Sequence, residues 1–228
     1  MRQIILDTET TGLDVSQGHR VIEIGCLELK DRRITGRTFH RYLCPDREVD
    51  PGALAVHGIT NDYLATQPRF PEIAAEFLEF VDGAELVIHN APFDVGFLEA
   101  ELGRVPDLGR RLEDTCRILD TLALARKLHP GQRNSLDALC KRYHVDNSRR
   151  DFHGALLDAR ILAEVYLAMT GGQGALTLEA EMAEPGFAQP AAARVERGAI
   201  CIPVIRATPE ELAAHERALD VVARSAAG

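Results

Sequence analysis

The chain has 228 residues, of which 46% are hydrophobic, and its formal net charge at pH 7 is −9. At about 150 residues per domain, this length fits one domain with an appendage, and the hydrophobic content excludes a wholly disordered chain. The acidic balance argues against a protein that coats DNA, and no hydrophobic run approaches the roughly 18 residues of a membrane span. The five cysteines form no Cys-x-x-Cys pair, which favours reduced thiols and a cytoplasmic protein.

Charge is distributed unevenly along the chain. Residues 1–102 carry 9 basic and 18 acidic side chains, whereas residues 103–150 carry 11 basic and 6 acidic ones. A basic segment on an acidic protein suits transient contact with a polyanion. A solvated arginine-rich face explains the same composition equally well before any motif is considered.

Predicted strands and helices alternate along the first 170 residues. Hydrophobic segments predict strands at residues 3–6, 21–30, 38–43 and 85–89, with a turn at 31–33 and the first two or three strands antiparallel. Periodicity and capping residues predict a helix from Pro71 to just before Gly83, and further helices at 93–102, 120–128, 135–143 and 154–169. This order predicts an α/β domain with a mixed sheet.

The composition changes after Met169. Residues 171–199 are rich in Gly, Ala, Glu, Gln and Pro, which predicts a flexible linker. Beyond it, Thr208-Pro209-Glu210-Glu211 is typical of a helix start. A hydrophobic element beyond a linker indicates docking on a partner, and the alternative is a helix packed back on its own domain.

Four carboxylates occupy positions where hydrophobic residues are expected. Asp7 and Glu9 lie two residues apart at the end of a hydrophobic strand, so both side chains face the same side of the sheet. Asp94 lies in the first turn of its helix on the hydrophobic side, and Asp158 lies on the hydrophobic stripe of another helix. An acid on a core-facing stripe is costly unless it is paired or binds a metal, so the four together indicate a shared function.

Metal-dependent hydrolysis explains these four acids together. Carboxylate oxygens are preferred ligands of Mg²⁺ and Mn²⁺, and converging acids can hold two ions roughly 4 Å apart to cleave phosphodiesters. One ion activates the attacking water and the other stabilises the leaving 3′ oxygen. His153, expected at the junction of a loop and the helix of Asp158, supplies a general base because an imidazole titrates at about pH 6.5.

Three motifs, in chain order, resemble those of the DEDDh family of 3′–5′ exonucleases. They are residues 5–13 (ILDTETTGL), 89–97 (HNAPFDVGF) and 153–159 (HGALLDA), the last in its histidine variant. The resemblance covers about residues 2–172. It implies a ribonuclease H-like fold, with a mixed sheet of antiparallel N-terminal and parallel strands flanked by helices, and a C-terminal tail. It also implies that Asp7, Glu9, Asp94 and Asp158 bind two divalent cations and that His153 is the general base.

Within the family, residues 49–51, 56–59 and 133–140 resemble the proofreading subunits of bacterial replicative DNA polymerases. The resemblance implies that the following residues surround the terminal nucleotide: Asp7, Glu9, Thr10, Leu13, His57, Phe93 and Asp158. A hydrophobic or aromatic wedge there stacks on an unpaired base without reading its identity. Gly52 departs from the pattern, because related sequences can carry a Glu near the nucleotide, and any side-chain contact from this position is lost.

The tail resembles the same subunits. The resemblance implies an exonuclease domain at 1–172, a flexible linker at 173–199 and a segment at 200–228 that binds the polymerase catalytic subunit, with a further small accessory subunit as partner. Gln173, Leu176 and Leu178 resemble a short motif that docks on the sliding clamp, and a plain linker is the alternative. Leu212 and Leu219 are the candidate contacts with the polymerase subunit.

These observations favour an enzyme that removes mismatched 3′-terminal nucleotides from DNA as monophosphates, with two Mg²⁺ or Mn²⁺ ions. One alternative is a stand-alone nuclease that acts on RNA or short oligonucleotides, which would need no docking helix. The other is a structural bridge between polymerase and sliding clamp, which would not need the intact set of acids and His153.

Overall fold

The computed structural model describes residues 1–148, 153–171, 208–210, 213–215 and 219. The chain divides into two units, Met1–Thr177 and Leu178–Gly228. In the second unit the described residues after Thr208 are helical, as expected for a helix that starts there. The predicted linker at 173–199 lies outside the described residues. No helix in the described ranges is long and hydrophobic enough to cross a membrane.

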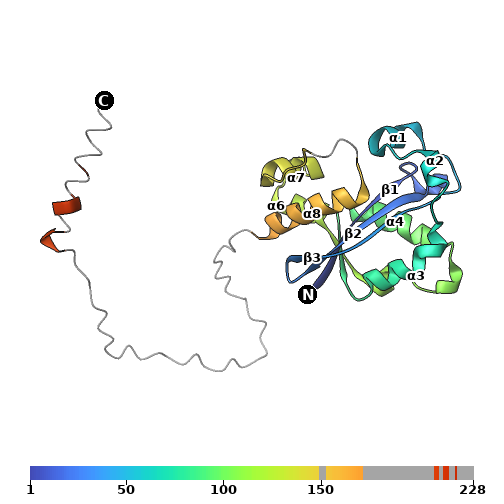
Figure 1. Ribbon diagram of the computed structural model, residues 1–228, viewed down its shortest axis with the longest axis horizontal. Coiled ribbons are helices and arrows are strands. Elements are labelled where there is room, and N and C mark those ends of the chain that lie inside the picture. Colours follow the sequence, from blue (N-terminus) through green and yellow to red (C-terminus); the bar gives the residue numbers. More distant parts are fainter. Residues whose placement is uncertain (149–152, 172–207, 211–212, 216–218, 220–228) are drawn as a thin grey trace, which may run out of the picture. The chain divides into compact units, whose positions relative to one another are not determined.

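The first unit is built on a five-stranded mixed sheet with the order β3-β2-β1-β4-β5 (Figure 1). The strands are β1 (Arg2–Thr10), β2 (Val21–Lys30), β3 (Arg33–Tyr42), β4 (Glu85–Ile88) and β5 (Arg117–Asp120). β2 pairs antiparallel with β1 and β3, whereas β1, β4 and β5 run parallel. The predicted mixed sheet with antiparallel N-terminal strands is therefore confirmed.

Helices connect and cover these strands. They are α1 (Pro51–His57), α2 (Asn61–Leu64), α3 (Phe70–Val81), α4 (Ala91–Leu102), α5 (Leu112–Thr115), α6 (Thr121–Leu128), α7 (Leu136–Tyr143) and α8 (Ala155–Thr170), with 3-10 turns η1 (Val15–Gln17) and η2 (Pro106–Leu108). Asp120 and Ser135 cap α6 and α7, because their side chains accept hydrogen bonds from backbone amides of the first turns. Helices α3, α4, α6, α7 and α8 start within two residues of their predicted positions.

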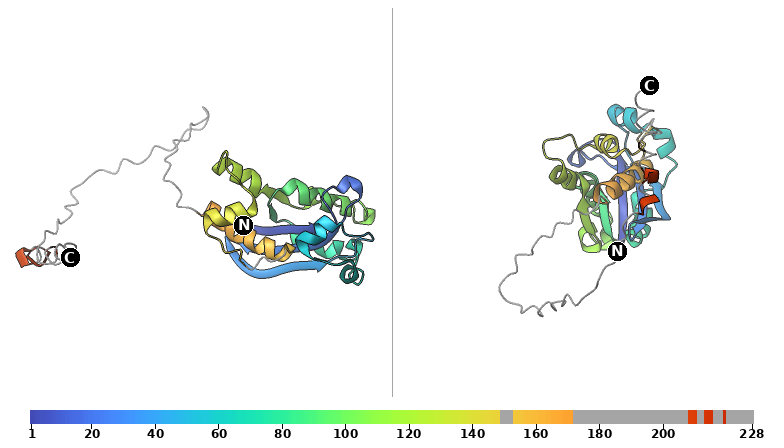
Figure 2. Two further views of the ribbon diagram at one scale, coloured as in Figure 1. Left: turned by 90° about the horizontal axis from the view of Figure 1, so that it is seen from above. Right: turned by 90° about the vertical axis from the view of Figure 1, so that its left-hand side faces the viewer.

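A helical layer covers each face of the sheet. Ile4 and Leu86 contribute to a core with α3 and α4, whereas their chain neighbours Ile5 and Val87 contribute to a second core with α7 and α8. This alternation follows from the two-residue period of a strand. Figure 2 shows the strands between the two layers. The main hydrophobic core therefore has two halves, one on each face of the sheet.

Two strands differ in extent from the prediction. β1 continues past Leu6 to Thr10, because the acidic residues after the hydrophobic run remain paired with β2. β3 begins at Arg33, earlier than expected. The prediction missed this part of the strand because residues 33–38 are exposed and carry no hydrophobic pattern. The short elements β5, α1 and α2 were not predicted, because four to seven residues give too little periodicity to detect.

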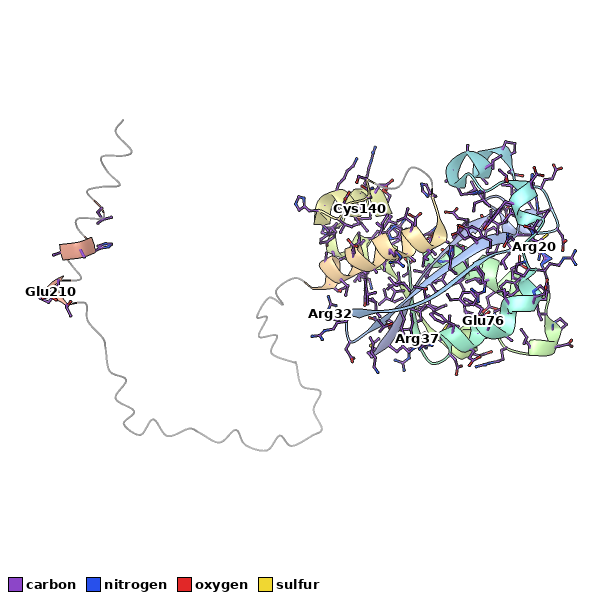
Figure 3. All side chains as sticks on the ribbon, viewed as in Figure 1. Arg20, Arg32, Arg37, Glu76, Cys140 and Glu210 are labelled. Carbon is purple, nitrogen blue, oxygen red and sulfur yellow. The ribbon has the colours of Figure 1, made fainter. Side chains whose placement is uncertain are left out.

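The β2–β3 turn holds the C-terminal end of α8. Arg32 donates hydrogen bonds from its guanidinium to Thr170 Oγ1 (2.8 Å) and to the Leu167 carbonyl (2.9 Å) (Figure 3). The opposite end of α8 lies over β2 at Gly25, close to the carboxyl end of β1. The sheet thus fixes α8 at both ends, which determines where the side chains of its first turn lie.

Candidate active site

Two of the predicted acids come from β1 and a third from the helix that follows β4. β1 and β4 are parallel, so their carboxyl ends lie at the same edge of the sheet, and α4 begins three residues after β4 ends. Asp94 in the first turn of α4 accepts hydrogen bonds at Oδ1 from the backbone N–H of Thr8 (3.1 Å) and from the Thr8 hydroxyl (2.7 Å). These bonds fix Asp94 beside Asp7 and Glu9.

A glycine in β2 lets the fourth acid reach the same place. Gly25 pairs with Asp7 across the β1–β2 ladder. A Cβ at Gly25 would lie 2.2 Å from the backbone N of Leu156, so only glycine allows this close approach of α8. Asp158 in the first turn of α8 is consequently buried next to β1, with 2% of its surface exposed.

His153 lies just before Gly154, the N-cap of α8, as the sequence predicts. Its backbone N–H donates to the Val56 carbonyl at the end of α1 (3.1 Å). Its Nδ1 lies 3.4 Å from Asp158 Oδ2, and its side chain is 43% exposed. The imidazole therefore contacts the acids on one side and solvent on the other.

All five predicted catalytic residues line one cavity of about 190 Å³. The lining is Asp7, Thr8, Glu9, His89, Asn90, Phe93, Asp94, Leu136, His153 and Asp158. Three of these residues, Glu9, His153 and Asp158, each place one potential metal-ligand atom within 4.8 Å of those of the other two. Because four carboxylates converge on one small space, the donor set fits hard divalent cations.

Burial shapes the electrostatics of this cavity. Burial raises the pKa of Asp94 to about 7, while the hydrogen bonds from Thr8 act in the opposite direction. A divalent cation at the cavity would favour the ionised form of such a carboxyl. The protein alone therefore disfavours the charged form of Asp94, and a bound cation would offset this cost.

A larger depression of about 610 Å³ adjoins the cavity and shares Thr8, Glu9 and Phe93 with it. The four residues predicted to surround the terminal nucleotide, in addition to the acids, all line this large depression: Thr10, Leu13, His57 and Phe93. Leu13 is 85% exposed, as a wedge against a base would be. Gly52 also lines the large depression, and the space beyond its Cα is open.

Local hydrogen bonds determine the conformation of two residues that line the large depression, Thr10 and His57. The Thr10 hydroxyl donates to the Gly12 carbonyl (2.6 Å), so Thr10 shapes the turn that leads to Leu13. His57 is buried, and its Nδ1 accepts a hydrogen bond from the backbone N–H of Ile59 (3.0 Å). Burial lowers the pKa of His57, and the neutral ring then carries its proton on Nε2.

The sequence did not identify His19. This buried histidine is hydrogen-bonded at Nδ1 with Thr11 Oγ1 (3.0 Å), and its Nε2 lies 3.4 Å from Asp50 Oδ2. Its ring packs on Gly12, where a Cβ would lie 2.3 Å away. His19 thus connects the loop that carries Leu13 to the start of α1. A single histidine before a strand gives no sequence signal for such a role.

The predicted partner-binding residues lie mainly beyond the described ranges. Gln173, Leu176, Leu178 and Leu212 are outside the described residues. Leu219 is helical and 51% exposed.

The exonuclease (RNase T) family model matches residues 4–166, a span that contains the four acids and His153. The chain belongs to this exonuclease family. It is 52% identical over 226 residues to DNA polymerase III subunit epsilon of Salmonella typhimurium, covering 97% of this chain and 93% of the relative. The Escherichia coli subunit gives the same identity and coverage. The epsilon subunit of Haemophilus influenzae is 54% identical over 189 residues, covering 81% of this chain and 73% of the relative. The predicted family is confirmed.

Solved structures agree with the fold. Exonuclease X in complex with 5′-overhanging duplex DNA superposes with a TM-score of 0.60 at 27% identity, covering 75% of this chain and 93% of that chain. Exonuclease I (apo) superposes with a TM-score of 0.62 at 18% identity, covering 75% of this chain and 42% of that chain. The ribonuclease H-like exonuclease fold implied by the motifs is therefore confirmed.

Proposed function

We propose that this protein is the proofreading 3′–5′ exonuclease of a bacterial replicative DNA polymerase, which removes mismatched 3′-terminal nucleotides as monophosphates. The observation that carries the proposal is the convergence of four carboxylates and one histidine in a cavity beside the large depression. The family match and the similarity to epsilon subunits over nearly the whole chain support it.

In this proposal Asp7, Glu9, Asp94 and Asp158 hold two Mg²⁺ or Mn²⁺ ions. When bound, such cations activate water and stabilise charge on the leaving 3′ oxygen. His153 accepts the proton of the attacking water, and its exposed side returns that proton to solvent. The hydrogen bond from its backbone to Val56 keeps the ring beside Asp158.

The terminal nucleotide occupies the large depression, with Thr10, Leu13, His57 and Phe93 around it. Leu13 and Phe93 contact the base through hydrophobic surfaces, which accept any of the four bases. Selectivity for mismatched ends comes from fraying, because an unpaired terminus costs less to unstack and extend into the site. His57 contributes a hydrogen-bond donor from Nε2 when it is neutral.

The tail extends the proposal to partners. Residues 200–228 bind the polymerase catalytic subunit, with Leu212 and Leu219 as contacts, and Gln173, Leu176 and Leu178 bind the sliding clamp. A small accessory subunit completes the assembly, which works in the cytoplasm. The similarity to epsilon subunits includes the tail, because the match covers 97% of this chain.

Substitution of one metal-binding acid tests the enzymatic role. We expect Asp7→Ala to abolish the release of nucleotides from 3′-labelled single-stranded DNA, and a chelator to abolish it in the wild type. Asp107→Ala, at an exposed acid in η2, is the matched control and should keep wild-type activity. Full activity of Asp7→Ala would refute the proposed site, and faster cleavage of labelled RNA than DNA would favour the stand-alone nuclease.

Deletion of residues 200–228 tests the tail. The shortened protein should hydrolyse single-stranded DNA at the wild-type rate and no longer co-elute with the polymerase catalytic subunit in gel filtration, whereas Asp7→Ala should still co-elute. Co-elution of the shortened protein would show that the polymerase contact lies elsewhere.

A further inference from the structure

A third depression adjoins the catalytic cavity and shares no lining residue with the large depression. It has a volume of about 520 Å³ and shares His89, Asn90 and Leu136 with the cavity. We call it the α6–α7 groove, and its lining is His89, Asn90, Leu122, Arg126, Gln132, Asn134, Ser135 and Leu136. The cavity therefore connects the large depression with the groove, because it has lining residues in common with each of them.

The chemistry of the groove differs from that of the cavity. No carboxylate lines it, whereas four line the cavity. Its polar groups are the imidazole of His89, side-chain amides, a hydroxyl and the guanidinium of Arg126. Arginine, amide and hydroxyl side chains contact phosphate oxygens in nucleic-acid complexes. Asn134 is held in the wall by hydrogen bonds from its amide to the carbonyls of His129 (3.2 Å) and Gln132 (3.1 Å).

Arg126 is the cation of the groove. It is exposed on α6 and makes no hydrogen bond or ion pair with another residue in the part of the chain that the structure describes. Burial lowers the pKa of His89, which lines both the groove and the cavity; the charge of Asp120 acts in the opposite direction, and Arg126 makes a smaller lowering contribution. Arg126 also belongs to the 103–150 segment whose excess of basic residues the catalytic site leaves unexplained.

The connection of the three depressions gives the direction of the substrate strand. If the terminal nucleotide lies in the large depression and the scissile phosphate at the acids, the α6–α7 groove is the adjoining depression left for the rest of the strand. We propose that the α6–α7 groove binds the phosphodiester backbone of the DNA strand on the 5′ side of the scissile bond, with Arg126 as its positive charge. This proposal rests on the proposed exonuclease function. Such a contact would offset the repulsion between the acidic cavity and the strand.

The test compares substrates with and without nucleotides on that side, using the full-length protein. The first substrate is an oligothymidylate of eight nucleotides, and the second is the p-nitrophenyl ester of thymidine 5′-monophosphate, which has no preceding nucleotide. For Arg126→Ala we expect the ratio of kcat/KM for the oligonucleotide to that for the ester to fall about tenfold, the loss of one charge-assisted hydrogen bond. The slope of log KM against log salt for the oligonucleotide should decrease by about one.

Lys127→Ala is the matched control, because Lys127 is the next residue of α6, is exposed and does not line the groove. It should leave the substrate ratio and the salt slope at the wild-type values. An equal fall of the ratio in both variants, or a wild-type ratio in Arg126→Ala, would overturn the proposal. A wild-type protein that cleaves neither substrate would instead refute the exonuclease function, so the two failures are distinguishable.

Discussion

Gly25 provides a sharp test of how the site is assembled. It pairs with Asp7 on β1 and lies directly beneath the first turn of α8. The change Gly25→Ala adds one methyl group, whose carbon would lie 2.2 Å from Leu156 N and 2.3 Å from the carbonyl carbon of Ala155. Both atoms belong to the backbone, so no side-chain rotation can relieve the overlap.

The size of the effect follows from these distances. Ordinary van der Waals contact needs about 3.5 Å, so the first turn of α8 must move outward by roughly 1 Å. His153 and Asp158 flank this turn and would move with it. A displacement of about 1 Å at reacting groups costs about a hundredfold in rate. Overpacking of this kind destabilises a protein by about 1–3 kcal/mol, which leaves a domain of ordinary stability folded.

The assay is kcat on 3′-labelled single-stranded DNA, with the melting temperature from circular dichroism measured alongside. Gly96→Ala on α4 is the matched control, because a Cβ there meets nothing within 4 Å. It should retain wild-type kcat and gain up to about 1 kcal/mol in stability from helix propensity. Equal kcat values for the two variants, with Gly25→Ala folded, would refute the reasoning that β2 positions α8 through this glycine.

Two further predictions concern buried charges. Burial raises the pKa of Asp94 to about 7, so its ionisation opposes folding increasingly as pH rises from about 4 towards 7. In the presence of a chelator, Asp94→Asn should therefore raise the melting temperature at pH 8 but not at pH 4. Arg20, labelled in Figure 3, binds the buried carboxylate of Glu101 through two hydrogen bonds of 2.6 and 2.7 Å. Arg20→Ala should therefore cost about 3–5 kcal/mol in urea unfolding, and the further change Glu101→Leu should recover part of that loss.

The sequence predicted the acids because each contradicts its local pattern. Asp7 and Glu9 interrupt a hydrophobic strand, and Asp158 lies on a hydrophobic helix face, so their positions could be read from short segments. Gly25 carries a weaker signal, since a glycine inside a strand indicates close approach of another backbone without saying which one. The contact with α8 involves residues 130 positions away along the chain, and local patterns contain no information about that pairing.

The short helix α1, which the sequence did not reveal, connects the proposed nucleotide site to His153, the proposed general base. Its residues His57 and Val56 line the large depression, and the Val56 carbonyl also accepts the hydrogen bond from the backbone of His153. At the other end, Asp50 lies 3.4 Å from His19, which holds the loop of Leu13. A nucleotide that packs against α1 therefore contacts the same element that positions His153. We infer that a 3′-terminal nucleotide that packs poorly against α1 would bind more weakly and would also displace His153. Substitutions in α1 should therefore change kcat and KM together.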